Sequence, residues 1–196
     1  MKIEFTKTHG AGNDFIIIYN NQHHKVLSSP NFIQQICDRK IGVGADGFIL
    51  LSDTDQYDYK MDYYNNDGTW ETACANGARC AALLMYVKGQ CGKEVNFIMG
   101  DGSHEAKIIN ENEIILSMRP PIYKTDTISL HGFQGRYVDS GAKHFVIMTD
   151  NFSFDDVNKI GRQISFDPVF KPHGVNVNFI SRINRNTVKV LTYEKG

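Results

Sequence analysis

The 196-residue chain lacks an excess of charge of either sign: 21 lysines and arginines are balanced by 22 aspartates and glutamates, for a formal net charge of −1. It also lacks a basic run, so nothing electrostatic favours nucleic acid as a partner. Apolar runs are short, and none approaches the roughly 20 residues of a membrane-spanning helix. The two longest, residues 15–19 and 48–51, suit buried strands. We therefore expect a soluble protein with neither nucleic acid nor a membrane as partner.

Cysteine is scarce, and its four positions form no CxxC pair and no regular spacing: Cys37, Cys74, Cys80 and Cys91. The chain opens MKIEFTKTHG, without the apolar core of a signal peptide. This pattern indicates free thiols, no metal site and a reducing, cytoplasmic location.

A phosphate-binding loop is missing as well. The glycine-rich segment DRKIGVGADGFILL (residues 38–51) has no GK[ST], and an apolar stretch follows where a P-loop or Rossmann motif needs a helix. A tight turn between two strands fits better. The segment HGAGND (residues 9–14) separates predicted strands 2–8 and 15–19 and is either a plain hairpin turn or a ligand-binding loop. Asn13 is its candidate ligand-binding residue, because an amide can both donate to a carboxylate and accept from an ammonium.

The most informative stretch runs from Tyr64 to Gly89 and contains Cys74 just ahead of an apolar helical run. One interpretation is a buried structural cysteine, since free cysteines are among the most buried residues. The other is a reactive thiol whose pKa is lowered by the start of a helix. The polar neighbours favour the second: Asn65, Asn66, Asp67, Gly68, Glu71, Asn76, Gly77 and Arg79.

Sequence patterns predict a mixed α/β (α+β) chain in two halves, residues 1–119 and 120–196, with a hinge at residues 119–121. The predicted helices are 30–39 (with Ser29 as N-cap and Cys37 in the core), 77–88 (with Cys80 packed and Gly89 ending it) and 154–164. Further strands are predicted at 58–64, 94–99, 104–110, 113–118, 137–139, 144–148, 174–179 and 188–191.

Seven segments in order resemble the cofactor-independent diaminopimelate epimerases: FTKTHGAGNDF, DRKIGVGADGFILL, YYNNDGTWETACANGARC, DGSHEA, DSGAKHFV, HGVNVNFI and TYEKG. The resemblance implies two pseudo-symmetric halves, each a barrel-like sheet around a central helix, with the active site between them. It implies interconversion of LL- and meso-diaminopimelate, for lysine and cell-wall synthesis. Two thiols would do this without pyridoxal phosphate, other cofactors or metal. The implied partner is a small amino-acid substrate, and a homodimer is left open.

By the same resemblance, Cys74 is the first catalytic thiol, and His144 and Glu194 adjust thiol ionisation. For His144 the alternative is a histidine that is simply hydrogen-bonded within a strand. The backbone of Ala75 and Asn76 would hold the substrate carboxylate. The implied substrate-binding residues are Asn13, Asn65, Ala75, Asn76, Asn176, Glu194 and Lys195, with Gly47 and Gly77 as further candidates.

Several positions depart from the family pattern. Ala75 replaces a glycine, and Ala142 and Lys143 replace Asn-Pro. Lys195 replaces an arginine, so a side chain that could bind a carboxylate with two hydrogen bonds is replaced by a single point charge. These changes leave two alternatives open: a racemase of another amino acid such as histidine, or a non-catalytic amino-acid-binding or interaction protein on the same fold.

The family's second cysteine motif is expected directly after Gly196, and the three other cysteines cannot replace it because all lie in the first half. We therefore expect a truncated form, a cleaved fragment or part of a longer protein. Its second half would then lack a central helix and leave one face of its sheet uncovered. For the 196-residue chain itself, the expectation is negligible two-base epimerisation.

Overall fold

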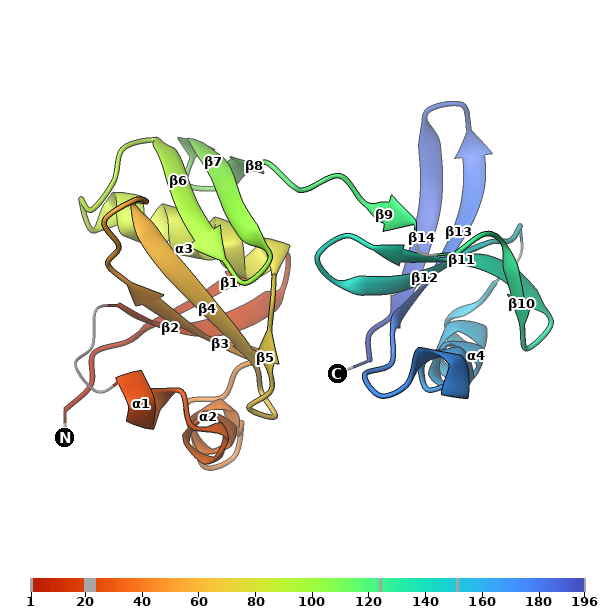
Figure 1. Cartoon of the computed structure of the whole chain (residues 1–196), viewed down its shortest axis with the longest axis horizontal. Coiled ribbons are helices and arrows are strands. Elements are labelled where there is room, and N and C mark those ends of the chain that lie inside the picture. Colours follow the sequence, from red (N-terminus) through yellow and green to blue (C-terminus); the bar gives the residue numbers. More distant parts are fainter. Residues whose placement is uncertain (1, 20–23, 124, 151, 196) are drawn as a thin grey trace. The chain divides into compact units, whose positions relative to one another are not determined.

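The computed structural model describes residues 2–19, 24–123, 125–150 and 152–195, and the chain divides into two compact units, Met1–Met118 and Arg119–Gly196. Figure 1 shows a curled sheet in each unit. No helix in the described ranges is long and apolar enough to cross a membrane. The described residues also contain no group of three or more His, Cys, Asp or Glu side chains that could hold a metal ion.

Unit 1 is an eight-stranded sheet in the order β1-β2-β3-β4-β6-β7-β8, with β5 paired to β4. Its strands are β1 (Thr6–Gly10), β2 (Asn13–Tyr19), β3 (Gly47–Ser52), β4 (Tyr59–Asn65), β5 (Trp70–Glu71), β6 (Glu94–Met99), β7 (Gly102–Asn110) and β8 (Glu113–Leu116). Its helices are α1 (His24–Leu27), α2 (Pro30–Cys37) and α3 (Ala75–Val87). The pairs β2–β3 and β4–β6 are parallel.

The apolar run of β2 is continuous because both of its faces are buried. Phe15 and Ile17 pack with α3 in one core, while Ile16 and Ile18 pack with α2 in a second core on the other face. Helix α3 contacts β1, β2, β4, β7 and β8, so the sheet curls around it (Figure 1). The predicted helix enclosed by strands is confirmed, although it begins two residues earlier than expected.

Three predictions in this unit need correction. The first strand is Thr6–Gly10 instead of 2–8, and the second begins at Asn13, so the turn between them is shorter than residues 9–14. Helix α2 ends at Cys37, two residues early, and residues 38–46 form a loop where we expected a strand and a tight turn. The Asp38 carboxylate explains the loop, because it accepts hydrogen bonds from the backbone N–H groups of Lys40 (2.7 Å) and Ile41 (3.0 Å). The predicted core positions of Cys37 and Cys80 are confirmed by exposures of 3% and 8%.

Unit 2 is a six-stranded sheet in the order β10-β11-β12-β13-β14, with β9 paired to β11. Its elements are β9 (Ile122–Tyr123), β10 (Ile128–Leu130), β11 (Phe133–Asp139), β12 (Lys143–Met148), α4 (Phe154–Ser165), η1 (Pro168–Phe170), β13 (Asn176–Asn184) and β14 (Thr187–Tyr193). Strands β12 and β13 are parallel and are joined through α4 and η1.

Helix α4 begins with a capping box between Ser153 and Asp156 and packs on β13 and β14. It covers the sheet face that carries Phe145, Ile147 and Phe179. The side chains that alternate with these point to the opposite face, where Met148 is 64% exposed. Mixed α/β halves with curled sheets confirm the predicted fold class.

Candidate active site

Cys74 is the N-cap residue of α3, with extended backbone angles (φ −147°, ψ 105°). Its sulfur accepts a hydrogen bond from the backbone N–H of Gly77 at 3.4 Å and another from the N–H of Asn76. The first turn of a helix has backbone N–H groups without partners inside the helix. Here two of them point at the thiol, which is the geometry expected for stabilising a negative charge on sulfur.

The prediction that this thiol ionises easily is wrong. Burial raises the pKa of Cys74 above its ordinary value, and the N–H groups of Gly77 and Asn76 lower it by less than burial raises it. The sequence showed the helix start but not how deeply the sulfur would be packed. Cys74 therefore carries its proton at neutral pH in the protein without ligand.

Asn76 and Asn13 meet beside the thiol. Asn13 begins β2 directly after the β1–β2 turn, and its Oδ1 accepts a hydrogen bond from Asn76 Nδ2 at 3.4 Å. Arg79, one turn further along α3, donates to Asn76 Oδ1. The side chains of two residues that the resemblance assigns to substrate binding are thus brought together, and Arg79 fixes the orientation of the Asn76 amide.

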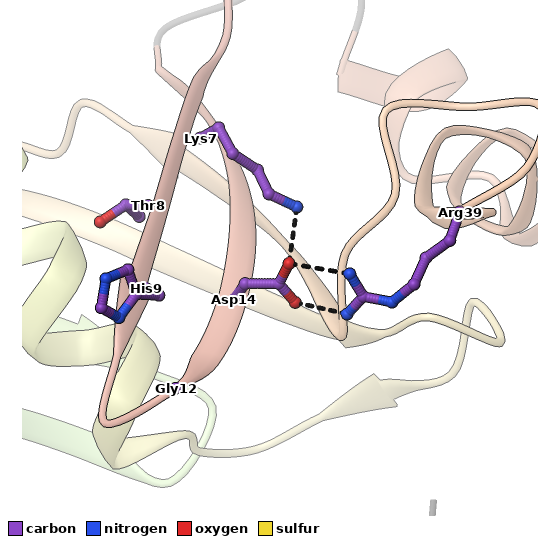
Figure 2. A pocket seen from close by; sticks show the side chains of 6 residues that line it. All are labelled: Lys7, Thr8, His9, Gly12, Asp14 and Arg39. Carbon is purple, nitrogen blue, oxygen red and sulfur yellow. Dashed lines mark hydrogen bonds and ion pairs between the residues drawn. The ribbon is translucent and has the colours of Figure 1, made fainter.

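An ion cluster holds the Asn13 loop against the loop before β3 (Figure 2). Arg39 donates to both carboxylate oxygens of Asp14, at 3.1 and 2.7 Å, and to Asp46 at 2.7 Å. Lys7 forms an ion pair with Asp14 at 2.8 Å. The Arg39 guanidinium holds the pKa of the Asp14 carboxyl well below its usual range. A shallow open pocket of about 490 Å³ adjoins this cluster.

The cluster reaches the candidate site through Asp46. Its Oδ2 accepts hydrogen bonds from Asn13 Nδ2 and from the backbone N–H of Asp14, both at 3.1 Å. Asn13 is therefore held on both sides of its amide, by Asp46 at the nitrogen and by Asn76 at the oxygen.

Asn65 ends β4 and pairs with Gly47 at the start of β3. Its Nδ2 donates to Thr69 Oγ1 at 3.2 Å and to a Glu71 carboxylate oxygen at 3.4 Å. Its Oδ1 accepts a hydrogen bond from the Tyr63 hydroxyl at 2.9 Å.

Gly47 leaves the space that this arrangement needs. A Cβ there would lie 2.6 Å from the ring of Tyr63, which is closer than real Cβ contacts come.

The candidate residues of unit 2 gather at one end of its sheet. His144 and Asn176 are neighbours on the parallel strands β12 and β13. His144 Nδ1 is 2.8 Å from Asn178 Oδ1, so this histidine is hydrogen-bonded between strands. Asn176 Oδ1 accepts a hydrogen bond from the backbone N–H of Lys195 at 3.1 Å, and Glu194 precedes this lysine.

Unit 1 thus brings together Asn13, Asn65, Cys74 and Asn76, and unit 2 brings together His144, Asn176 and Lys195. That the two groups form one site stays a prediction from the resemblance. Three residues of this arrangement were not predicted from the sequence: Tyr63, Asp46 and Arg39. A signal existed for Tyr63, because it follows Tyr59 and Met61 at every second position of a strand, on the face that packs in the core around α3, where a tyrosine hydroxyl needs a partner.

Comparisons with known proteins identify the family of this chain. The family model for diaminopimelate epimerase matches residues 5–124. The chain is 34% identical over 207 aligned residues to the diaminopimelate epimerase of Aquifex aeolicus, covering 99% of this chain and 74% of that protein. It is 36% identical over 191 residues to the diaminopimelate epimerase of Flavobacterium psychrophilum, covering 97% of this chain and 72% of that protein.

Solved structures share the fold at low sequence identity. A probable proline racemase from Agrobacterium radiobacter matches with a TM-score of 0.68 at 13% identity, covering 97% of this chain and 70% of that one. A phenazine biosynthesis protein of the PhzF family from Bacillus anthracis matches with a TM-score of 0.64 at 13% identity, covering 98% of this chain and 72% of that one. With sequence relatives above 30% identity along almost its whole length, the chain belongs to the diaminopimelate epimerase family.

Proposed function

We propose that this chain serves the interconversion of LL- and meso-diaminopimelate by an amino-acid epimerase, and that its own part is the exchange of the α-proton through Cys74. The observation that carries the proposal is the Cys74 sulfur, which caps α3 and accepts hydrogen bonds from two backbone N–H groups. Membership of the family supports the substrate. The four cysteines are free thiols, which also fits the proposal of a cytoplasmic location.

The chemistry needs a base for a very weakly acidic proton. The Cys74 thiolate takes the proton from the α-carbon, and the C–H electron pair stays on that carbon, where it delocalises into the carboxylate. Hydrogen-bond donors near the carboxylate stabilise this charge, a role that the family resemblance assigns to the backbone of Ala75 and Asn76. A proton delivered to the opposite face by a second acid completes the inversion.

The amides of unit 1 fit the recognition of an amino acid. Asn13, Asn65 and Asn76 can donate to a carboxylate and accept from an ammonium group. Hydrogen bonds to its nitrogen and its oxygen fix the orientation of the Asn13 amide, so its donor and its acceptor have set positions toward a ligand. We propose that Asn176, Glu194 and Lys195 bind polar groups of the substrate and that His144 and Glu194 adjust thiol ionisation.

Proton exchange tests the proposal because it requires Cys74 but no second acid. The chain is incubated in D₂O with LL- or meso-diaminopimelate, and α-deuterium is measured by mass spectrometry. Once the thiol proton has exchanged with solvent, its return to the carbanion leaves deuterium on the α-carbon. We expect incorporation that increases with pH above neutrality, since burial raises the pKa of the thiol.

Two variants and one alternative substrate complete the test. Cys74→Ser is expected to abolish exchange, whereas Cys91→Ser, which changes a partly buried thiol in the same unit, keeps it. Exchange with histidine but not diaminopimelate would favour the racemase alternative. Binding of diaminopimelate without any exchange in the wild-type chain would favour a binding protein and contradict the proposal.

A further inference from the structure

Tyr63 lies beside Cys74 in a position fixed by packing. It stands on β4 with 9% of its surface exposed, in the core around α3. Its ring meets Phe15 edge-on, with centroids 6.1 Å apart and an interplanar angle of 75°. Gly47 lies against the ring edge, where a Cβ would be 3.1 Å from the hydroxyl oxygen. The hydroxyl therefore has little freedom to move away.

This hydroxyl has one hydrogen and two acceptors within its reach. It donates to Asn65 Oδ1 at 2.9 Å, and the Cys74 sulfur lies near enough for the hydroxyl to lower the pKa of that thiol. A phenol can donate one hydrogen bond while it accepts another. The protonation state of Cys74 decides which partner receives the hydrogen.

We propose that Tyr63 is a positioning residue whose hydroxyl hydrogen moves from Asn65 to the Cys74 sulfur when that thiol gives up its proton. The inference rests on the proposed role of Cys74 and extends it to a residue that touches the sulfur and Asn65. With a neutral thiol, S–H donates to the Tyr63 oxygen and the hydroxyl donates to Asn65. With a thiolate, the hydroxyl rotates and donates to sulfur, and Asn65 Oδ1 becomes available to a ligand.

The surroundings of Tyr63 and Cys74 determine how much a hydrogen bond from the Tyr63 hydroxyl can stabilise a Cys74 thiolate. Glu71 and Asp46 lie near Tyr63 and oppose a negative charge on its oxygen, and the Cys80 thiol lies near Cys74. Burial raises the pKa of Tyr63 well above its ordinary value, so the hydroxyl keeps its proton and remains the donor. Together with the N–H groups of Asn76 and Gly77, it is what stabilises a thiolate at this buried position.

Alkylation of Cys74 as a function of pH tests the proposal without any substrate. The full chain is treated with iodoacetamide between pH 6 and pH 11, and modification of the Cys74 peptide is followed by mass spectrometry. Tyr63→Phe is expected to raise the pH midpoint of Cys74 alkylation by about one to two pH units, which is the effect expected from losing one hydrogen bond to an anion. Asn65→Leu removes the competing acceptor, so the midpoint is expected to fall.

The chain offers a matched control and an internal reference. Tyr59 is on the same strand, fully buried, and its hydroxyl has no hydrogen-bond partner among the described residues. Tyr59→Phe should therefore leave the Cys74 midpoint unchanged. Burial raises the pKa of Cys91 to about 11, so its peptide reports the reaction conditions in the same digest.

Equal midpoints in Tyr63→Phe and Tyr59→Phe would overturn the proposal. If circular dichroism shows that Tyr63→Phe is unfolded, the Asn65→Leu variant provides the test. A pH midpoint of Cys74 alkylation at or above the wild-type value in that variant overturns the proposal, and a lower midpoint supports it. Failure of deuterium exchange would contradict the proposed function while leaving this alkylation result intact, so the two failures are distinguishable.

Discussion

Substitutions of Asp46 should weaken the hydrogen bonds that hold Asn13, and Asp46→Ala should do so more than Asp46→Asn. The carboxylate accepts three hydrogen bonds, from Asn13 Nδ2 and Asp14 N at 3.1 Å and from Arg39 at 2.7 Å. In Asp46→Asn, one oxygen remains. If that oxygen faces Arg39, the new amide nitrogen points at two donors and two hydrogen bonds are lost, at about 1–3 kcal/mol.

The opposite amide orientation is less costly. The oxygen then keeps Asn13 and the Asp14 N–H, and only the contact with Arg39 is lost, in a pair whose side chains are 58% and 43% exposed. Such exposed pairs contribute about 0–1 kcal/mol. We therefore expect Asp46→Asn to reduce the free energy of unfolding by about 1 kcal/mol or less and to keep Asn13 in place. Asp46→Ala loses all three contacts, about 2–3 kcal/mol, and releases the Asn13 amide.

Urea denaturation followed by tryptophan fluorescence measures this change in unit 1, because the chain's single tryptophan, Trp70, lies there on β5. Asp55→Asn, at an exposed aspartate in the loop before β4, is the control and should be neutral. In the deuterium-exchange assay, KM should rise for Asp46→Ala and stay close to the wild-type value for Asp46→Asn. Equal losses of stability in all three variants would refute the reasoning.

Three further outcomes are expected. Because the pKa of Asp14 is lowered in the folded chain, its contribution to stability is complete above about pH 4 and is lost as the pH falls below that value; urea midpoints at pH 7 and pH 3 should differ less in Asp14→Asn than in the wild type. Gly47→Ala places a Cβ 2.6 Å from the Tyr63 ring and should cost about 1–3 kcal/mol in tryptophan-monitored unfolding, whereas a neutral result would show that the ring can move aside. Ser153→Ala removes the N-cap of α4 and should cost about 1 kcal/mol, measured by denaturation followed by circular dichroism; an unchanged midpoint would contradict the assigned cap.

Local patterns predicted α3, which positions Cys74, but not the loop of residues 38–46, which carries Arg39 and Asp46. The apolar run after Asn76 predicted α3, and Gly89 ends it with a positive φ of 71°, the conformation that glycine adopts most readily. The resemblance grouped Asn13, Asn65 and Cys74, which lie far apart in the sequence.

Long-range packing accounts for what could not be predicted. The contact between Asn13 and Asp46 joins residues 33 positions apart, and nothing local to either residue indicates it. The direction of the Cys74 pKa shift depends on how completely the folded chain removes water from the sulfur, which a helix-start pattern does not contain. The partner of His144 was missed for a related reason, since Asn178 reaches it only across the parallel pairing of β12 and β13.

A sulfur that keeps its proton is also a poor target for oxidants. Peroxide reacts with thiolates, so a cysteine held as the neutral thiol at neutral pH enters the sulfenic–sulfinic–sulfonic acid series slowly. The burial that keeps Cys74 protonated should therefore also protect it from irreversible oxidation. In the proposed reaction, peroxide would attack this sulfur only while it is ionised.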